Sequence, residues 1–322
     1  MVIQSLMKMS PFDMRGQIEL KYGMYATLGG VLLFAGINKL VKILGPPKNL
    51  KNPEKNEPKW RNTYVSYLHA ILISGWSIGS TVMYPELVYD LIGHINYVTY
   101  YCVCVTTGYF TYDLLDNIVN GLFISNWEVS LHHIANLSVF YCNVFLKQNI
   151  GFNILALYLE VNSIFLHWRK LLQMDRVPFS SRKYIAIKHL NIMSVVLFRF
   201  PATFLITWAA YAFHDRVPQF LATLVFIACP FMHILNSVVL YRLVKSDLLR
   251  GPDGSPCSIM DTYRRDWLIL TKETSGLLDE TNSGINGDFP NNNDLSNGKS
   301  IGLPTANGTD VHETSNGHPK SS

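Results

Sequence analysis

The sequence has few charged residues. Asp, Glu, Lys and Arg make up 16% of its 322 residues, against about 25% in soluble domains. Hydrophobic residues make up 48%, and the mean hydropathy is +0.15. Residues 22–245 are rich in apolar and aromatic types, whereas Asn, Gly, Ser, Thr and Asp dominate residues 251–322. This division predicts an all-α, polytopic membrane helical bundle that is followed by a disordered C-terminal tail.

Several sequence patterns that mark other protein classes are missing. There is no HExxH motif and no set of spaced histidine boxes, which disfavours zinc proteases and di-iron desaturases. The five cysteines show no metal-ligand spacing, so we expect neither a metal nor a cofactor. The two halves do not look like inverted repeats, which weakens a transporter interpretation. The net charge of +4 is spread over loops, so we expect no nucleic-acid partner.

The apolar stretches predict about seven transmembrane helices. A helix needs about 20 mostly apolar residues to cross the hydrocarbon core. The fourth stretch is the shortest, and residues 118–127 before it are expected to form a partly inserted turn. The seven stretches are 22–43, 63–83, 95–112, 131–145, 150–168, 189–212 and 217–243.

Lys and Arg in the loops predict the orientation of these helices. They cluster in the loop at 48–61, in the loop at 169–188 and after the last helix at 242–250, and the segment at 86–90 has none. Cytosolic loops carry the excess of Lys and Arg. We therefore expect a cytosolic C-terminus and an extracytosolic N-terminus.

The predicted organisation has four parts. They are an extracytosolic N-terminus at 1–21, a first transmembrane helix at 22–45, a helical membrane domain at 59–245 with about six further transmembrane helices, and a disordered cytosolic tail at 246–322.

Ionisable side chains inside the apolar stretches are the strongest indication of a site. Charged types cost roughly +2.5 to +3.5 kcal/mol each at the centre of an inserted helix. The fourth stretch contains His132 and His133, and the fifth contains Glu160 near mid-depth. The two histidines are separated by about 100° around a helix, so they cannot point the same way. Either they serve a site or they join helices by hydrogen bonds.

Glu160 requires a partner or a proton if it lies at mid-depth. Arg199 or a histidine is the expected partner, and structural pairing and functional use both remain open. Asp113 and Asp116 belong either to the same cavity or to the cytosolic interface. The residues expected to line a lipid cavity together with the three above are His69, Asp113, Asp116, Asn136, Asn162, His167 and Arg199.

These residue types suit acid–base chemistry on a lipid. Histidine titrates near pH 6.5, so small shifts select its reactive form, and it is the usual general base. His132, His133 and Glu160 are therefore the candidate catalytic residues, with Glu160 orienting the imidazole or stabilising its cation. Acyl transfer to a lipid amine or hydroxyl requires no further protein groups.

Three motifs in order resemble the TLC (TRAM-LAG1-CLN8) domain family. They are KWRNTYVSYLHA at 59–70, YDLLD at 112–116 followed by WEVSLHH at 127–133, and LEVNSIFLHWRKLL at 159–172. The last motif looks like the branch of the family that holds TLC domain-containing proteins one and two. The resemblance covers roughly residues 60–245 and implies a membrane domain of several helices.

The resemblance also carries expectations about function. Ceramide synthases of this family acylate a sphingoid base with acyl-CoA, and their histidine pair matches His132 and His133. Their motif has aspartates where this sequence offers Glu160 and Asn162, and no homeobox-like segment precedes the domain. The more similar branch is implicated in limiting the incorporation of polyunsaturated chains into phospholipids of the plasma membrane.

Three hypotheses follow. The first is a regulator of phospholipid acyl composition and membrane fluidity, whose partners are phospholipids or acyl chains. The second is an acyltransferase of the ceramide-synthase type, for which acyl-CoA is a substrate. The third is a structural or chaperone-like membrane protein. The plasma membrane is the expected location, with the endoplasmic reticulum as the alternative.

Overall fold

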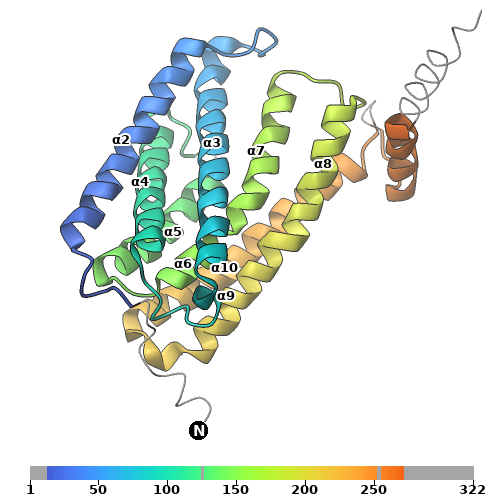
Figure 1. Cartoon of the computed structure of the whole chain (residues 1–322). Coiled ribbons are helices and arrows are strands. Elements are labelled where there is room, and N and C mark those ends of the chain that lie inside the picture. The colour runs from blue at the N-terminus through green and yellow to red at the C-terminus, as the bar shows by residue number, and fades with distance from the viewer. Residues whose placement is uncertain (1–12, 125–126, 252–254, 272–322) are drawn as a thin grey trace, which may run out of the picture. The chain divides into compact units, whose positions relative to one another are not determined.

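The computed structural model describes residues 13–124, 127–251 and 255–271, which are helical over most of their length (Figure 1). Within these ranges the only β-structure is two isolated bridges, Asp13 with Ile95 and Arg250 with Pro256. The predicted all-α helical bundle is therefore confirmed. Most of the predicted tail lies outside the described residues.

The helices correspond to the predicted apolar stretches, but those at Pro53–Met83 and Arg182–Ser194 begin ten and seven residues before the predicted starts at 63 and 189. A π-helical turn at Val195–Arg199 joins α8 to α9, so that the two form one long helical segment, and a second π-helical turn at Val244–Leu248 extends α10. Short 3-10 helices lie at Pro85–Val88 and His214–Arg216. The α-helices are α2 (Leu20–Leu44), α3 (Pro53–Met83), α4 (Tyr97–Val119), α5 (Trp127–Leu146), α6 (Ile150–Leu157), α7 (Leu159–Met174), α8 (Arg182–Ser194), α9 (Phe200–Ala212) and α10 (Gln219–Leu243).

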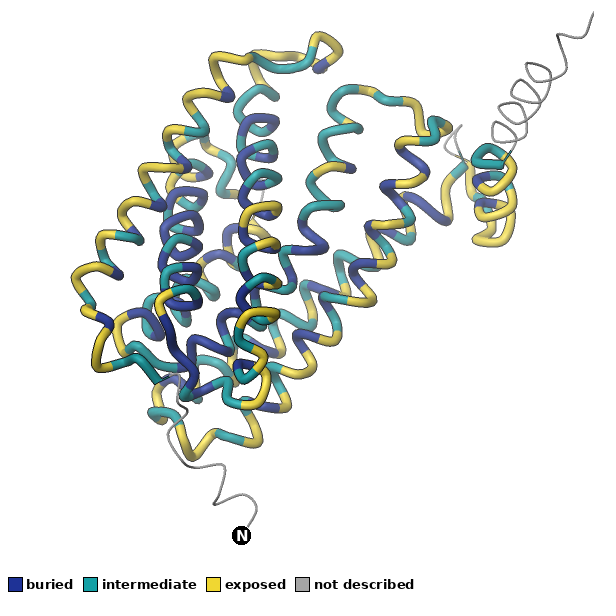
Figure 2. Tube along the Cα trace, in the orientation of Figure 1, coloured by how far each residue is buried: buried dark blue, intermediate teal, exposed yellow. Residues whose placement is uncertain are grey.

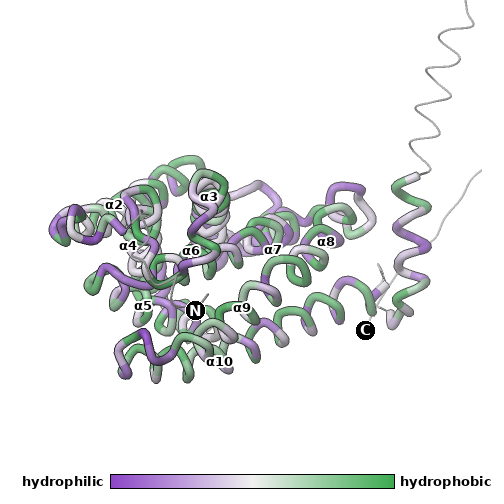
Figure 3. The backbone as a smooth tube through the Cα atoms, turned by 60° about the horizontal axis from the view of Figure 1, so that its bottom comes forward, coloured by the Kyte–Doolittle hydropathy of each residue, from purple (hydrophilic) through white to green (hydrophobic). Residues whose placement is uncertain are grey.

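Among the described residues, five helical segments are long and apolar enough to cross a membrane, namely Leu20–Leu44, Val129–Leu146, Ile150–Met174, Arg182–Ala212 and Gln219–Leu248. Figure 3 shows hydrophobic residues along much of α9 and α10, where exposed side chains such as Trp208 and Ile227 suit contact with lipid. These features support a membrane-spanning bundle. The number of seven spans stays a prediction.

Helices α3 and α4 are long, but their composition is more polar than that of the five segments. Helix α3 buries Ser66, His69, Ser74, Ser77 and Ser80. Helix α4 packs against α2, α3 and α5, and Figure 2 shows how much of it is buried. Ser66, Ser77 and Ser80 donate hydrogen bonds to carbonyls of their own helix, so these buried hydroxyls are paired without water. The polarity of α3 and α4 thus follows from their interior position.

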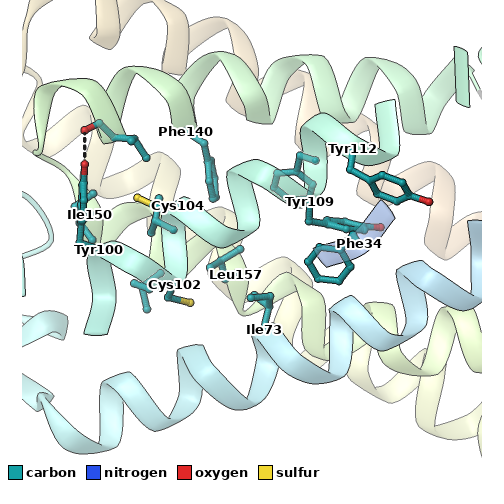
Figure 4. Packing of buried hydrophobic residues seen from close by; sticks show 14 of the residues in the cluster. Phe34, Ile73, Tyr100, Cys102, Cys104, Tyr109, Tyr112, Phe140, Ile150 and Leu157 are labelled. Atoms are coloured by element: carbon teal, nitrogen blue, oxygen red, sulfur yellow. Dashed lines mark hydrogen bonds between the residues drawn. The ribbon is translucent and has the colours of Figure 1, made fainter. Parts of the chain in front are cut away.

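Aromatic side chains form the centre of the packed core (Figure 4). The Tyr100 hydroxyl donates a hydrogen bond of 3.1 Å to the carbonyl of Val144, which joins α4 to α5. The ring of Tyr109 stacks on His69 at a centroid distance of 3.5 Å, and Phe34 from α2 meets Tyr109 edge-on. These contacts bury an otherwise costly imidazole between rings of α2 and α4.

Glycines let α2 and α4 approach closely. A Cβ atom at Gly30 would lie 2.7 Å from the carbonyl oxygen of Val105, and one at Gly108 would lie 2.9 Å from the Cα of Gly30. Small residues of this kind allow membrane helices to pack backbone against backbone.

A Gly108→Ala variant therefore tests this packing. The added methyl group meets backbone that cannot turn away, so we expect a loss of about 1–3 kcal/mol of stability, the usual cost of overpacking. Thermal unfolding of the purified protein measures the loss. The control is Gly29→Ala, where a Cβ atom meets nothing within 4 Å; an equal loss there would contradict the account.

The structure differs from the predicted disorder at residues 259–271, which form a helix. Thr262 donates a hydrogen bond of 2.8 Å to the carbonyl of Leu248, and Asp266 pairs with Lys188 and His189 of α8. Burial alone would raise the pKa of Asp266, but hydrogen bonds and charge from His189 and Lys188 lower it below its usual value. The sequence pattern did not reveal this docking because its partners lie about 77 residues away.

Candidate functional site

A buried carboxylate, Asp113 of α4, joins three helices. Its side chain accepts hydrogen bonds from Asn62 of α3 at 2.8 Å and from Asn117 of α4 at 2.9 Å. The Nδ1 atom of His133 on α5 lies 2.9 Å from Asp113 Oδ2. Asp113 is 1% exposed, so these groups replace the water that a carboxylate otherwise binds. Asp113 is buried between the helices and does not line the cavity described below.

Asp116 lies one turn further along α4 and is half-buried. It accepts hydrogen bonds from Asn38 of α2 at 3.0 Å, from Asn62 at 3.2 Å and from Asn120 at 2.9 Å. Asn62 thus bridges both aspartates. The sequence gave no indication that Asn62 of α3 reaches α4.

The two adjacent histidines of α5 have different surroundings, as helical geometry predicts. His133 faces Asp113, whereas His132 faces α10 and a cavity. The His132 Nε2 atom lies 3.0 Å from the amide nitrogen of Asn136, and its Nδ1 atom lies 3.2 Å from the sulfur of Met232. Only His132 of the pair lines the cavity.

The cavity lies between α5, α6, α7, α9 and α10, and most of its wall is apolar. Four polar side chains from α5, α7 and α9 belong to this wall. They are His132, Asn136, Glu160 and Thr203. Three asparagines line another part of the wall, namely Asn143, Asn149 and Asn153. A long apolar wall with a few convergent polar groups is typical of small-molecule sites.

Glu160 has a histidine neighbour, one of the two partners expected from the sequence. Its Oε2 atom lies 3.9 Å from Nδ1 of His69, whose two ring nitrogens have no hydrogen-bond partner within the described residues. Arg199, the other expected partner, donates to Ser163 and Asn236 at 3.3 Å each and lies near enough for its charge to act on the Glu160 carboxylate. Glu160 is therefore the acidic group of the cavity, and Arg199 is engaged in holding helices together.

The remaining predicted cavity residues lie outside the cavity wall. The Asn162 amide donates to Asn191 at 2.9 Å and to Ser194 at 2.9 Å, which joins α7 to α8. His167 lies half-buried in α7. Of the predicted set, the cavity wall contains His132, Glu160 and Asn136, and it omits His69, Asp113, Asp116, His133, Asn162, His167 and Arg199.

Arg169 of α7 is buried. It is 8% exposed and forms a buried ion pair with Asp247 of the π-helical turn after α10. The sequence did not reveal this pair, because 78 residues separate its two partners.

The arrangement provides one imidazole and one carboxylate on the wall of a mostly apolar cavity. His132 lines this cavity, whereas His133 lies against Asp113 and joins α5 to α4. Among the residues that the structure describes, no cluster of three His, Cys, Asp or Glu side chains is arranged to hold a metal ion.

The role of Asp113 predicts a large stability difference between the two aspartates. An Asp113→Ala variant leaves Asn62, Asn117 and His133 without their buried acceptor, so we expect a loss of about 3 kcal/mol, as for other broken buried pairs. Asp116→Ala is the matched control, because Asp116 is half-buried and water can replace its bonds. Thermal unfolding in the same detergent compares them; equal losses would show that Asp113 does not hold the three helices together.

Comparison with known proteins identifies the family. The family model of the TLC domain matches residues 59–245. TLC domain-containing protein 2 of Danio rerio is 32% identical over 217 residues, which cover 67% of this chain and 88% of the relative. TLC domain-containing protein 1 of Gallus gallus is 32% identical over 180 residues, covering 56% and 71%. The same protein of Rattus norvegicus is 25% identical over 231 residues, covering 71% and 91%.

No solved structure matches the chain. The resemblance inferred from the three motifs is confirmed, since both the family match and the relatives agree with it. The chain therefore belongs to the TLC domain family.

Proposed function

We propose that this protein regulates the acyl composition of membrane phospholipids, and thereby membrane fluidity, by limiting the incorporation of polyunsaturated chains. The observation that carries the proposal is the cavity with a mostly apolar wall that also contains His132, Asn136 and Glu160. The direction of the effect follows the branch of the family that the sequence resembles.

The wall of the cavity suits an acyl chain. Phe110, Phe140, Leu157, Leu221 and Val225 are among its apolar residues. Each methylene group transferred from water to such a wall gains about 0.8 kcal/mol. A chain that enters from the bilayer does not gain this free energy, because it already lies in an apolar medium. Selection between chains would therefore come from shape, because kinked and straight chains fill a packed wall differently.

The polar groups of the cavity would position the bound lipid. The His132 imidazole and the Glu160 carboxylate line the same space, so a polar group of the lipid that lies beside them has a hydrogen-bonding partner. The apolar wall would hold the chain. The proposed location is the plasma membrane with a cytosolic C-terminus, and the proposed partners are phospholipids and their acyl chains.

One observation favours a second function, acyl transfer from acyl-CoA in the manner of a ceramide synthase. An imidazole that lines a lipid cavity can remove the proton from an acceptor hydroxyl or amine. His132 would be this base, because His133 faces Asp113 and does not line the cavity. The endoplasmic reticulum would suit this second function.

The proposal predicts the lipid composition of cells that lack the protein. We expect polyunsaturated phospholipids to rise, to return to normal with the wild-type protein, and to stay high with His132→Ala or Glu160→Gln, because these variants remove the polar groups of the cavity. Mass spectrometry of phospholipids and ceramides measures this. The matched control is His214→Ala, since the His214 side chain is half exposed and is not among the cavity residues.

The outcomes separate the three hypotheses. Full rescue by well-expressed His132→Ala and Glu160→Gln variants would contradict a cavity function and favour a purely structural protein. Selective loss of ceramides of one chain length, together with acyl-CoA turnover by the purified protein that His132→Ala abolishes, would favour acyl transfer. An unchanged phospholipid profile in the deficient cells would overturn the proposed regulation.

A further inference from the structure

Three buried asparagines line the cavity away from His132 and Glu160. Asn143 belongs to the last turns of α5, Asn149 precedes α6, and Asn153 lies in the first turn of α6. Their exposed fractions are 1%, 3% and 2%. Asn149 has a φ of 58°, a conformation that Asn tolerates better than most residues. We call these three residues the Asn triad.

The amides of the Asn triad form a chain of hydrogen bonds with two open ends. Asn149 donates to Asn143 Oδ1 at 3.3 Å, and Asn143 donates to Asn153 Oδ1 at 2.8 Å. Asn149 Oδ1 and Asn153 Nδ2 then have no hydrogen-bond partner within the described residues. Reversing all three amides would exchange the two ends, but one acceptor and one donor would remain open.

The chemistry of the two open ends selects a ligand group. Burying polar groups without partners costs free energy, so a ligand that pairs with both is favoured. One acceptor and one donor match a hydroxyl group, which donates one hydrogen bond and accepts others. A charged group fits less well, because the triad is neutral and Glu160 is the only Asp, Glu, Lys or Arg among the residues that the structure places on the cavity wall.

The position of the Asn triad indicates what kind of molecule carries this hydroxyl. Asn143 follows His132 by eleven positions along α5, which is roughly 16 Å at 1.5 Å per residue. The wall between them is apolar apart from Asn136 and contains Val139 and Phe140. A hydroxyl at the triad would therefore be attached to a long apolar chain that points towards His132.

We infer that the Asn triad binds the free hydroxyl of a single-chain lipid whose acyl chain fills the cavity. A glycerol lipid has such a hydroxyl beside its headgroup when one of its two acyl chains is missing. This inference rests on the proposed function and deepens it, because a lipid of this kind is what an acyl-composition pathway acylates. The triad sets which lipid binds, while His132 and Glu160 lie at the other part of the chain.

The test compares two ligands that differ by one hydroxyl. Purified full-length protein in lipid nanodiscs is titrated with 1-oleoyl lysophosphatidylcholine and with its 2-deoxy analogue, and binding is measured with radiolabelled lipid. We expect the wild type to bind the hydroxyl lipid about tenfold more tightly, the factor that two net hydrogen bonds provide. Equal affinity of the wild type for both lipids would overturn the inference and leave the triad as a water site.

Variants localise the effect. We expect Asn153→Leu and Asn149→Leu to bind the two lipids with nearly equal affinity, so that the tenfold preference is lost. Leucine is similar in size to asparagine but cannot pair with a hydroxyl. The matched control is Val225→Ala in the apolar wall, which should weaken both lipids equally and keep the preference. Retention of the preference in both leucine variants would also overturn the inference. If those variants do not fold, the comparison of the two lipids on the wild type still tests whether the protein recognises the hydroxyl.

The result is independent of the cellular test of the proposed function. If the wild-type protein binds both lipids equally while His132→Ala still fails to restore phospholipid composition in cells, only the inference about the triad is rejected. A hydroxyl preference in a protein whose loss leaves phospholipid composition unchanged would reject the regulatory role and keep the binding site.

Discussion

The arrangement of the site depends on the contacts of the buried Asp113 carboxylate with three helices. The carboxylate accepts hydrogen bonds from Asn62 of α3 and Asn117 of α4 and lies 2.9 Å from the His133 ring of α5. A carboxylate in a bilayer is tolerated only when protein groups replace its water. Because His133 is turned towards this carboxylate, its neighbour His132 is turned about 100° away, and it lines the cavity.

The polar groups of the bundle then divide into two kinds. Some hold helices together, as Arg169 does with Asp247 and as Asn162 does with Asn191 and Ser194, although Asn162 Oδ1 has no partner within the described residues. Those at the cavity wall include incompletely paired groups, such as the open ends of the Asn triad. In a medium without water, the second kind is maintained at a cost, and binding of a lipid offsets that cost. This difference is the physical reason for proposing a function in the cavity.

The sequence was enough to predict the helices, the family and the different directions of His132 and His133. Hydrophobic stretches fix the helices, and a 100° turn per residue fixes relative directions within one helix. Contacts between helices could not be predicted in this way. Asn62 reaches Asp113 across 51 positions, and Arg169 pairs with Asp247 across 78 positions. The Asn triad was missed because three asparagines at 143, 149 and 153 follow no single helical stripe.

Mass spectrometry of the lipids that co-purify with the protein tests most directly whether the cavity holds lipid. The comparison is between the wild type and Ala228→Phe, which would fill the cavity from α10, where Ala228 lines the wall. The account predicts that the wild type carries bound lipid after mild detergent washing and that the variant, equally monodisperse, loses most of it. Equal amounts of the same lipids on both proteins would contradict the account.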